Sequence, residues 1–387
     1  MTLPTPGAGS PVQLTWPAPG RSFLTLLAVL AVYRLGCYIP LPGLLPGLSS
    51  DMVGSQSGAS ERLSVFALGV VPIFSAMMLC EVAKLGFASL RRWQSASRAN
   101  ARALNFSVTI VALTISGLQA TGIAIALEHM PVLVDDPAWL FRIQIVATLV
   151  AATALLAWLG DRVSRLGVIS GFWLLFAAPS LAHAPGAVAI WIEMLREGAV
   201  SLGSLAIASA FPVLSIFLLV ICGTVAGGKK PPVGTESAAF FRRPLMLDVW
   251  SPYLAYLTSG LVLGAIAYFA GDPSWTTQDS LLAYGRPPHI ILIAMVIGLF
   301  TALRAGASGL GSAEHAASRH LWLPALAEIG ICGTSEFLTL HLGVPFVTGG
   351  PVLIVISALA LGILRSFAIQ PDVPAGRSAR ASRNSMG

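Results

Sequence analysis

The sequence predicts an all-α, polytopic membrane protein with about ten transmembrane helices. Of its 387 residues, 55% are hydrophobic and only 10% are charged, and the mean hydropathy is +0.79. Soluble globular proteins carry about 25% charged residues, so this composition excludes a soluble enzyme, a nucleic-acid-binding protein and a disordered chain. The chain also contains 38 Gly and 26 Pro, which bilayer helices tolerate better than soluble helices do. At roughly 20 residues per helix plus short loops, about ten spans fit this length.

Ten apolar stretches in the sequence match this estimate. The predicted helices cover residues 22–40, 65–88, 104–127, 139–160, 168–184, 206–226, 246–270, 288–304, 321–342 and 350–369. We expect a basic turn at 91–102 and a tight turn at 161–167. The stretch 185–205 is expected to lie outside the helices, with room for a short surface helix.

The basic residues set the predicted topology. Of the 23 Lys and Arg residues, 18 lie near every second loop or in the terminal segments. The positive-inside rule places these loops and both termini in the cytoplasm and requires an even number of spans. We therefore expect a flexible cytoplasmic tail at 1–20, a ten-helix membrane domain at 21–370 and a basic cytoplasmic tail at 371–387.

The sequence contains no pattern typical of a cofactor, a metal site or an enzyme. It has no Walker A loop and no GxGxxG, which argues against a nucleotide site. His315 and His320 are five residues apart, so one helix face would not present both to a metal, and we expect them in an inner loop. The cysteines stand singly in apolar runs and predict buried hydrophobes rather than disulfides or zinc ligands. They are Cys37, Cys80, Cys222 and Cys332.

Among the ionisable residues within or near predicted spans, the candidates are Arg34, Asp248, Glu328 and Glu336. A charge at membrane depth is costly and normally faces protein or water, so each is a functional candidate. The structural alternative is a paired or snorkelling side chain near a helix end. On these grounds alone the chain is a polytopic transporter or channel.

Four longer segments favour a channel. Tyr33–Gly43, Val65–Ala76, Thr148–Ala177 and Val344–Gly350 resemble, in this order, segments of the SecY family, the protein-conducting channel of bacterial secretion. The resemblance covers about residues 33–369. It implies ten helices in two inverted halves of five, an hourglass pore with a hydrophobic constriction, and a lateral gate between the second helix and the seventh and eighth. The constriction positions that it implies are Val70, Phe74, Phe172, Phe176 and Val355.

The chain departs from the family mainly in its loops. The inner loops at 227–245 and 305–320 and the plug region at 44–60 are all short. The first loop keeps four basic residues that the resemblance implies for docking the motor ATPase SecA or a ribosome: Lys229, Lys230, Arg242 and Arg243. Other implied partners are SecE-like and SecG-like small membrane subunits, a signal-sequence-bearing polypeptide and the lipid bilayer.

The resemblance thus implies a passive channel that conducts unfolded polypeptide across or into the bacterial inner membrane. One alternative is a small-molecule or ion transporter built on an inverted repeat. That function needs charges near the membrane midplane, for which the sequence singles out Arg34. A second alternative is a non-conducting paralogue that acts as an assembly or scaffold protein.

Overall fold

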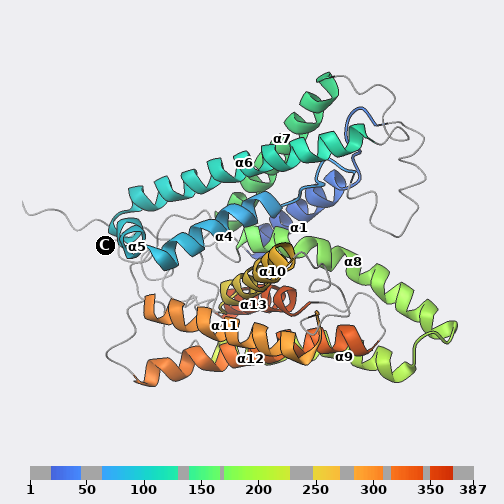
Figure 1. Cartoon of the computed structure of the whole chain (residues 1–387), viewed down its shortest axis with the longest axis vertical. Helices are drawn as coiled ribbons and strands as arrows, with labels where there is room; N and C mark the ends of the chain where they lie inside the picture. Colours follow the sequence, from blue (N-terminus) through green and yellow to red (C-terminus); the bar gives the residue numbers. More distant parts are fainter. Residues whose placement is uncertain are drawn as a thin grey trace, which may run out of the picture. The chain divides into compact units, whose positions relative to one another are not determined.

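In the computed structural model, the residues described are 19–44, 63–129, 139–165, 170–226, 247–270, 283–307, 315–342 and 349–368. They form eleven α-helices, shown in Figure 1, and one isolated antiparallel bridge between Pro40 and Ser64. The helices are α1 (Pro19–Gly36), α4 (Val71–Gly86), α5 (Ala88–Ala96), α6 (Arg98–Glu128), α7 (Trp139–Arg165), α8 (Gly171–Arg196), α9 (Leu202–Ala226), α10 (Trp250–Ala270), α11 (Pro287–Ala307), α12 (His315–His341) and α13 (Gly350–Ala368).

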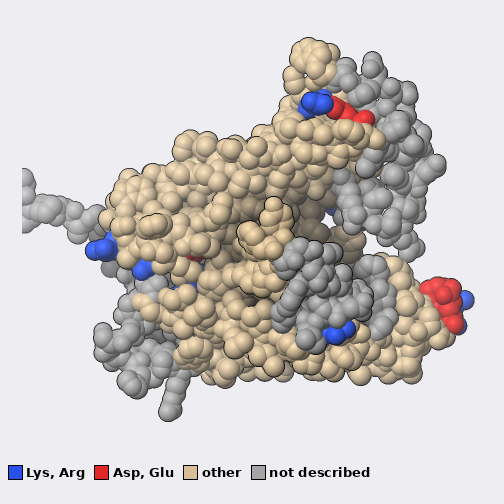
Figure 2. All heavy atoms as spheres, viewed as in Figure 1, with Lys and Arg blue, Asp and Glu red and all other residues tan. Residues whose placement is uncertain are grey.

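The predicted all-helical membrane fold is confirmed. Within the described residues, six helices, α6 to α11, are each long enough and apolar enough to cross a bilayer. The bent pair α4–α5 adds a seventh if it is counted as one span. All the helices except α5 occupy the positions of predicted spans, which is consistent with ten spans. On the face shown in Figure 2, charged side chains form only small separate groups, as expected for a surface that faces lipid.

The basic turn predicted at 91–102 is wrong, because this segment is mostly helical. The helices α4 and α5 meet at Phe87 with a bend of 107°, and α6 starts at Arg98. The Arg91 guanidinium donates hydrogen bonds to the carbonyls of Lys84 and Leu85 at the end of α4. Ser97 caps α6, its Oγ accepting a hydrogen bond from the Asn100 amide at 3.1 Å. These side chains satisfy backbone groups that a sharp bend would otherwise leave without partners.

Three other predicted boundaries are also wrong. α7 continues through Asp161 to Arg165, where a turn was expected. α8 extends to Arg196 although Pro179 and Pro185 lie inside it, because membrane helices tolerate internal proline. His315 begins α12 instead of lying in a loop. The predicted tails fall largely on residues 1–18 and 369–387, which lie outside the described part.

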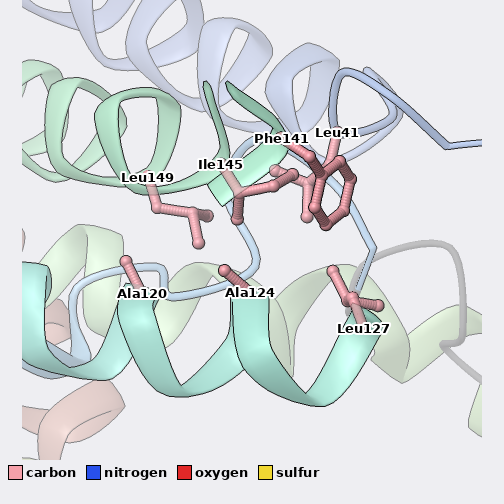
Figure 3. Close-up of a cluster of buried hydrophobic side chains, with 7 residues drawn as sticks. All are labelled: Leu41, Ala120, Ala124, Leu127, Phe141, Ile145 and Leu149. Carbon is pink, nitrogen blue, oxygen red and sulfur yellow. The ribbon is translucent and has the colours of Figure 1, made fainter. Parts of the chain in front are cut away.

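The chain divides into two compact units, and the first contains α1, α7, most of α6 and the first turns of α4 and α8. Its core is a cluster of buried side chains, most of them from α6 and α7 (Figure 3). Ala120 and Ala124 on α6 face Ile145 and Leu149 on α7, and all four are buried. Small side chains at a helix contact let two membrane helices approach closely. Leu41, Leu127 and Phe141 complete the cluster.

The second unit contains α9 to α13, α5 and the later parts of α4 and α8. In this unit α12 packs against α9, α10, α11 and α13. A Cβ at Gly350 would lie 2.6 Å from the Cys332 Cα, and one at Gly223 would lie 2.6 Å from the Leu361 side chain. These glycines therefore permit α13 to approach α12 and α9 closely.

Candidate functional site

Four aromatic rings pack together in the first unit. They belong to Phe74 on α4 and to Phe172, Trp173 and Phe176 on α8, and we call them the aromatic cluster. The Phe74 ring centroid lies 5.0 Å from that of Phe176 and 6.5 Å from that of Phe172, with which it is stacked. Trp173 meets the three phenylalanine rings edge-on, with centroids 5.0 to 6.4 Å apart. Offset and edge-to-face contacts of this kind are favourable arrangements of aromatic rings.

The four rings lie in the first turns of α4 and α8, so the points where these two helices begin determine their positions. Gly69, with φ +52°, lies in the series of turns that precedes α4. The Phe74 amide donates a hydrogen bond of 2.9 Å to the Val70 carbonyl. α8 begins at Gly171, directly against α7, since a Cβ there would lie 2.1 Å from the Gly160 carbonyl oxygen. The Gly171 amide also donates a hydrogen bond to Ser164 Oγ at 2.9 Å. The first turns of α8 are thereby held at a fixed distance from α7.

The structure brings together three of the five predicted constriction residues: Phe74, Phe172 and Phe176. Val70 is buried immediately before α4. Val355 lies on α13 in the other unit and is fully buried. The predicted docking residues lie outside the described part of the chain; they are Lys229, Lys230, Arg242 and Arg243. A pore role for the constriction residues stays a prediction.

Sequence reasoning missed Trp173, although it directly follows Phe172. Its side chain is 2% exposed and touches every phenylalanine of the cluster. The run Gly171-Phe172-Trp173 offered a signal, because two consecutive aromatic residues at a helix start can reach two neighbouring elements. The cluster is apolar apart from the indole N–H, so a narrow pore lined by it would exclude water and would not bind ions.

Arg34 lies in the last turn of α1 and is stabilised locally. Its guanidinium donates a hydrogen bond to the Tyr38 hydroxyl at 2.9 Å and lies 4.9 Å from the centre of that ring. This is a hydrogen bond combined with a cation–π contact at a helix end.

The other three ionisable candidates lie in the second unit. Asp248, just before α10, pairs with Arg304 of α11 at 3.1 Å and accepts a hydrogen bond from Ser251 at 2.5 Å. Arg304 also lies 3.5 Å from Glu81 of α4, which pairs with Lys84. Asp248, Arg304, Glu81 and Lys84 form what we call the Arg304 network. Paired charges are the expected solution for ionisable groups at membrane depth.

A buried pair, His289 and Glu336, joins α11 to α12. His289 Nδ1 lies 2.7 Å from Glu336 Oε2, and the Gly285 amide donates to the same oxygen at 3.3 Å. Gly285 has φ +83°, and a Cβ there would lie 2.7 Å from the Glu336 carbonyl oxygen. Within the described residues, no group of three or more His, Cys, Asp or Glu side chains could hold a metal ion.

Comparisons with known proteins confirm the resemblance. Residues 64–227 match the family model SecY. The Protein translocase subunit SecY of Escherichia coli K12 is 26% identical over 399 residues, covering 89% of this chain and 90% of that protein. Two solved structures, a protein-conducting channel and Sec61 from the canine ribosome–channel complex, each superpose with a TM-score of 0.50. They are 13% and 15% identical, and each alignment covers 96% of this chain and 98% of the other. The chain is thus a multi-pass membrane protein with the fold of these channels.

Proposed function

We propose that this SecY-like chain is the channel subunit through which unfolded polypeptides pass across or into the bacterial inner membrane. The observation that carries the proposal is the match in fold over 96% of the chain to a solved protein-conducting channel. The sequence similarity supports it, because it extends over 90% of the Escherichia coli protein translocase subunit. Both termini are placed in the cytoplasm by the distribution of basic residues.

The aromatic cluster serves, in this proposal, as part of the hydrophobic constriction. An apolar constriction excludes water when it is narrow, and so it blocks ions while the channel is at rest. Because the rings are held to one another by packing, an extended polypeptide can displace them without breaking hydrogen bonds between them. The chain is a passive conduit that carries no nucleotide-binding motif, so an external motor, a ribosome or the proton gradient supplies the driving force.

Small membrane subunits of the SecE and SecG kinds are the proposed partners in the bilayer. On the cytoplasmic side, Lys229, Lys230, Arg242 and Arg243 would contact SecA or a ribosome. The canine Sec61 structure comes from a ribosome–channel complex, which supports a ribosome as one candidate. The cargo is a polypeptide that bears a signal sequence.

Site-specific photo-crosslinking in intact membranes tests the proposal. A photoreactive amino acid would replace Phe74 in the aromatic cluster, and in a control it would replace Phe106 on α6, which is 68% exposed. A secretory polypeptide is arrested in transit by a folded C-terminal domain. We expect adducts with the arrested polypeptide at position 74 and none at position 106. Equal labelling at both positions, or none at position 74, would contradict conduction past this cluster.

A further inference from the structure

Glu328 is a fully buried carboxyl group in the interior of α12. Its side chain has 0% exposure, and neither oxygen forms a hydrogen bond of normal geometry with any described residue, although the Asp248 backbone lies nearby. It lies in the fourth turn of a 27-residue helix packed on four others. A carboxylate in such surroundings loses its hydration without forming a compensating hydrogen bond, which costs far more than burial of a neutral acid.

Among the described residues, the positive charge that acts on Glu328 is Arg304, which already pairs with other carboxyl groups. Arg304 lies close enough to Glu328 to attract it, but its Nε pairs with Asp248 and its guanidinium also reaches Glu81. Asp248 in turn lies close enough to Glu328 to repel a second negative charge. One arginine facing three carboxyl groups cannot neutralise all of them, even with Lys84 pairing with Glu81.

The other elements around α12 supply no further described cation near Glu328. From α10, Tyr253 and Tyr256 lie around Cys332, one turn beyond Glu328. α9 contains no charged residue, and the only one in α13 is Arg365 near its end. Glu336, two turns beyond, has its own partner in His289. Apart from Arg304, the titratable groups around Glu328 and Cys332 are thus the carboxyls of Asp248 and Glu336 and the phenols of Tyr253 and Tyr256.

These observations distinguish among the ways to neutralise Glu328. A metal ion needs several ligands, and no suitable group of three occurs within the described residues. A direct ion pair would need Arg304 to leave Asp248. A bound proton needs neither, because it removes the charge while the carboxyl oxygens remain in place.

We propose that Glu328 is a proton-binding site within the membrane domain, occupied when Arg304 bridges Asp248 and Glu81. Release of the proton creates a third carboxylate beside Arg304 and draws its guanidinium away from Glu81. Proton occupancy would therefore set how firmly α4 is tied to α10 and α11. Cys332 and Glu336 follow Glu328 at intervals of one helical turn and continue the line of protonatable groups toward His289. The inference concerns proton binding and does not rest on polypeptide conduction.

Infrared spectroscopy of the purified full-length protein in lipid nanodiscs tests the site. At about pH 8, exposed carboxyl groups are ionised, so a carbonyl band of a protonated acid that shifts in D₂O reports a buried carboxyl. We expect this band in the wild type, its loss in Glu328→Gln, and its retention in the control Glu193→Gln. Glu193 is the matched control because its side chain is 56% exposed and pairs with Arg196 at 3.0 Å.

Identical spectra for the wild type and Glu328→Gln at about pH 8 would overturn the proposal. If Glu328→Gln does not yield folded protein, Glu328→Asp replaces it: a band shifted in frequency supports the assignment, and an unchanged spectrum overturns it. Loss of the wild-type band on addition of sodium chloride at constant pH would also overturn it, because it would indicate a site for a monovalent cation.

Discussion

Replacing Phe172 by Ser distinguishes a pore constriction from ordinary helix packing. Phe172 is 3% exposed and contacts three other rings, with centroid distances of 6.5 Å to Phe74, 5.0 Å to Trp173 and 6.0 Å to Phe176. The substitution removes all three contacts and leaves a hydroxyl in their place. Phe141 provides a matched control, because it is 5% exposed in the hydrophobic cluster between α6 and α7.

The structure gives the expected loss of stability. Each ring contact contributes about 0.5–1.5 kcal/mol beyond area burial, so three contacts amount to about 1.5–4.5 kcal/mol. Removal of a buried Phe side chain costs about 3–5 kcal/mol in total. Phe141→Ser falls in the same range of about 3–5 kcal/mol, because it creates a cavity of similar size. The two variants should therefore be destabilised alike.

Their ion conductance should differ. If the aromatic cluster keeps the resting channel dry, Phe172→Ser lets water enter and conducts ions in planar bilayers, because a wider and more polar constriction no longer dewets. Phe141→Ser should leave the bilayer tight. Thermal unfolding of both variants in the same detergent verifies that their stabilities match. The reasoning is refuted if folded Phe172→Ser stays impermeable or if both variants leak equally.

Two further predictions concern helix packing and topology. Gly171→Ala should destabilise the protein by about 1–3 kcal/mol, because its Cβ would lie 2.1 Å from the Gly160 carbonyl oxygen. The control Gly186→Ala in the same helix meets nothing within 4 Å and should stabilise by about 0.5–1 kcal/mol; equal melting temperatures for the two variants would contradict the close contact. A reporter fused after Gly198, in the exposed turn beyond α8, should signal from the outer side, and one after Gln370 from the cytoplasm. An outward signal at Gln370 would rule out an even number of spans.

The sequence by itself determined the class of protein and the approximate position of its helices. A composition with 10% charged residues leaves no soluble alternative, and uninterrupted apolar stretches reveal membrane helices because each must span the same bilayer thickness. Phe74, Phe172 and Phe176 were assigned to one site from resemblance alone, and the structure shows that they meet. Helix ends were less predictable. Proline usually interrupts a helix, but α8 continues through Pro179 and Pro185, because a membrane favours continued backbone hydrogen bonding.

Only the tertiary structure decided which polar groups meet. Arg304 is 56 residues from Asp248 along the chain, and His289 is 47 from Glu336, so no local pattern links them. The sequence singled out Arg34 as the charge nearest the midplane, but the structure pairs it with Tyr38 at a helix end and buries Glu328 instead. The physical reason is that hydropathy describes the preference of a single helix for lipid over water. The pairing of a buried charged group depends instead on the side chains that neighbouring helices place beside it.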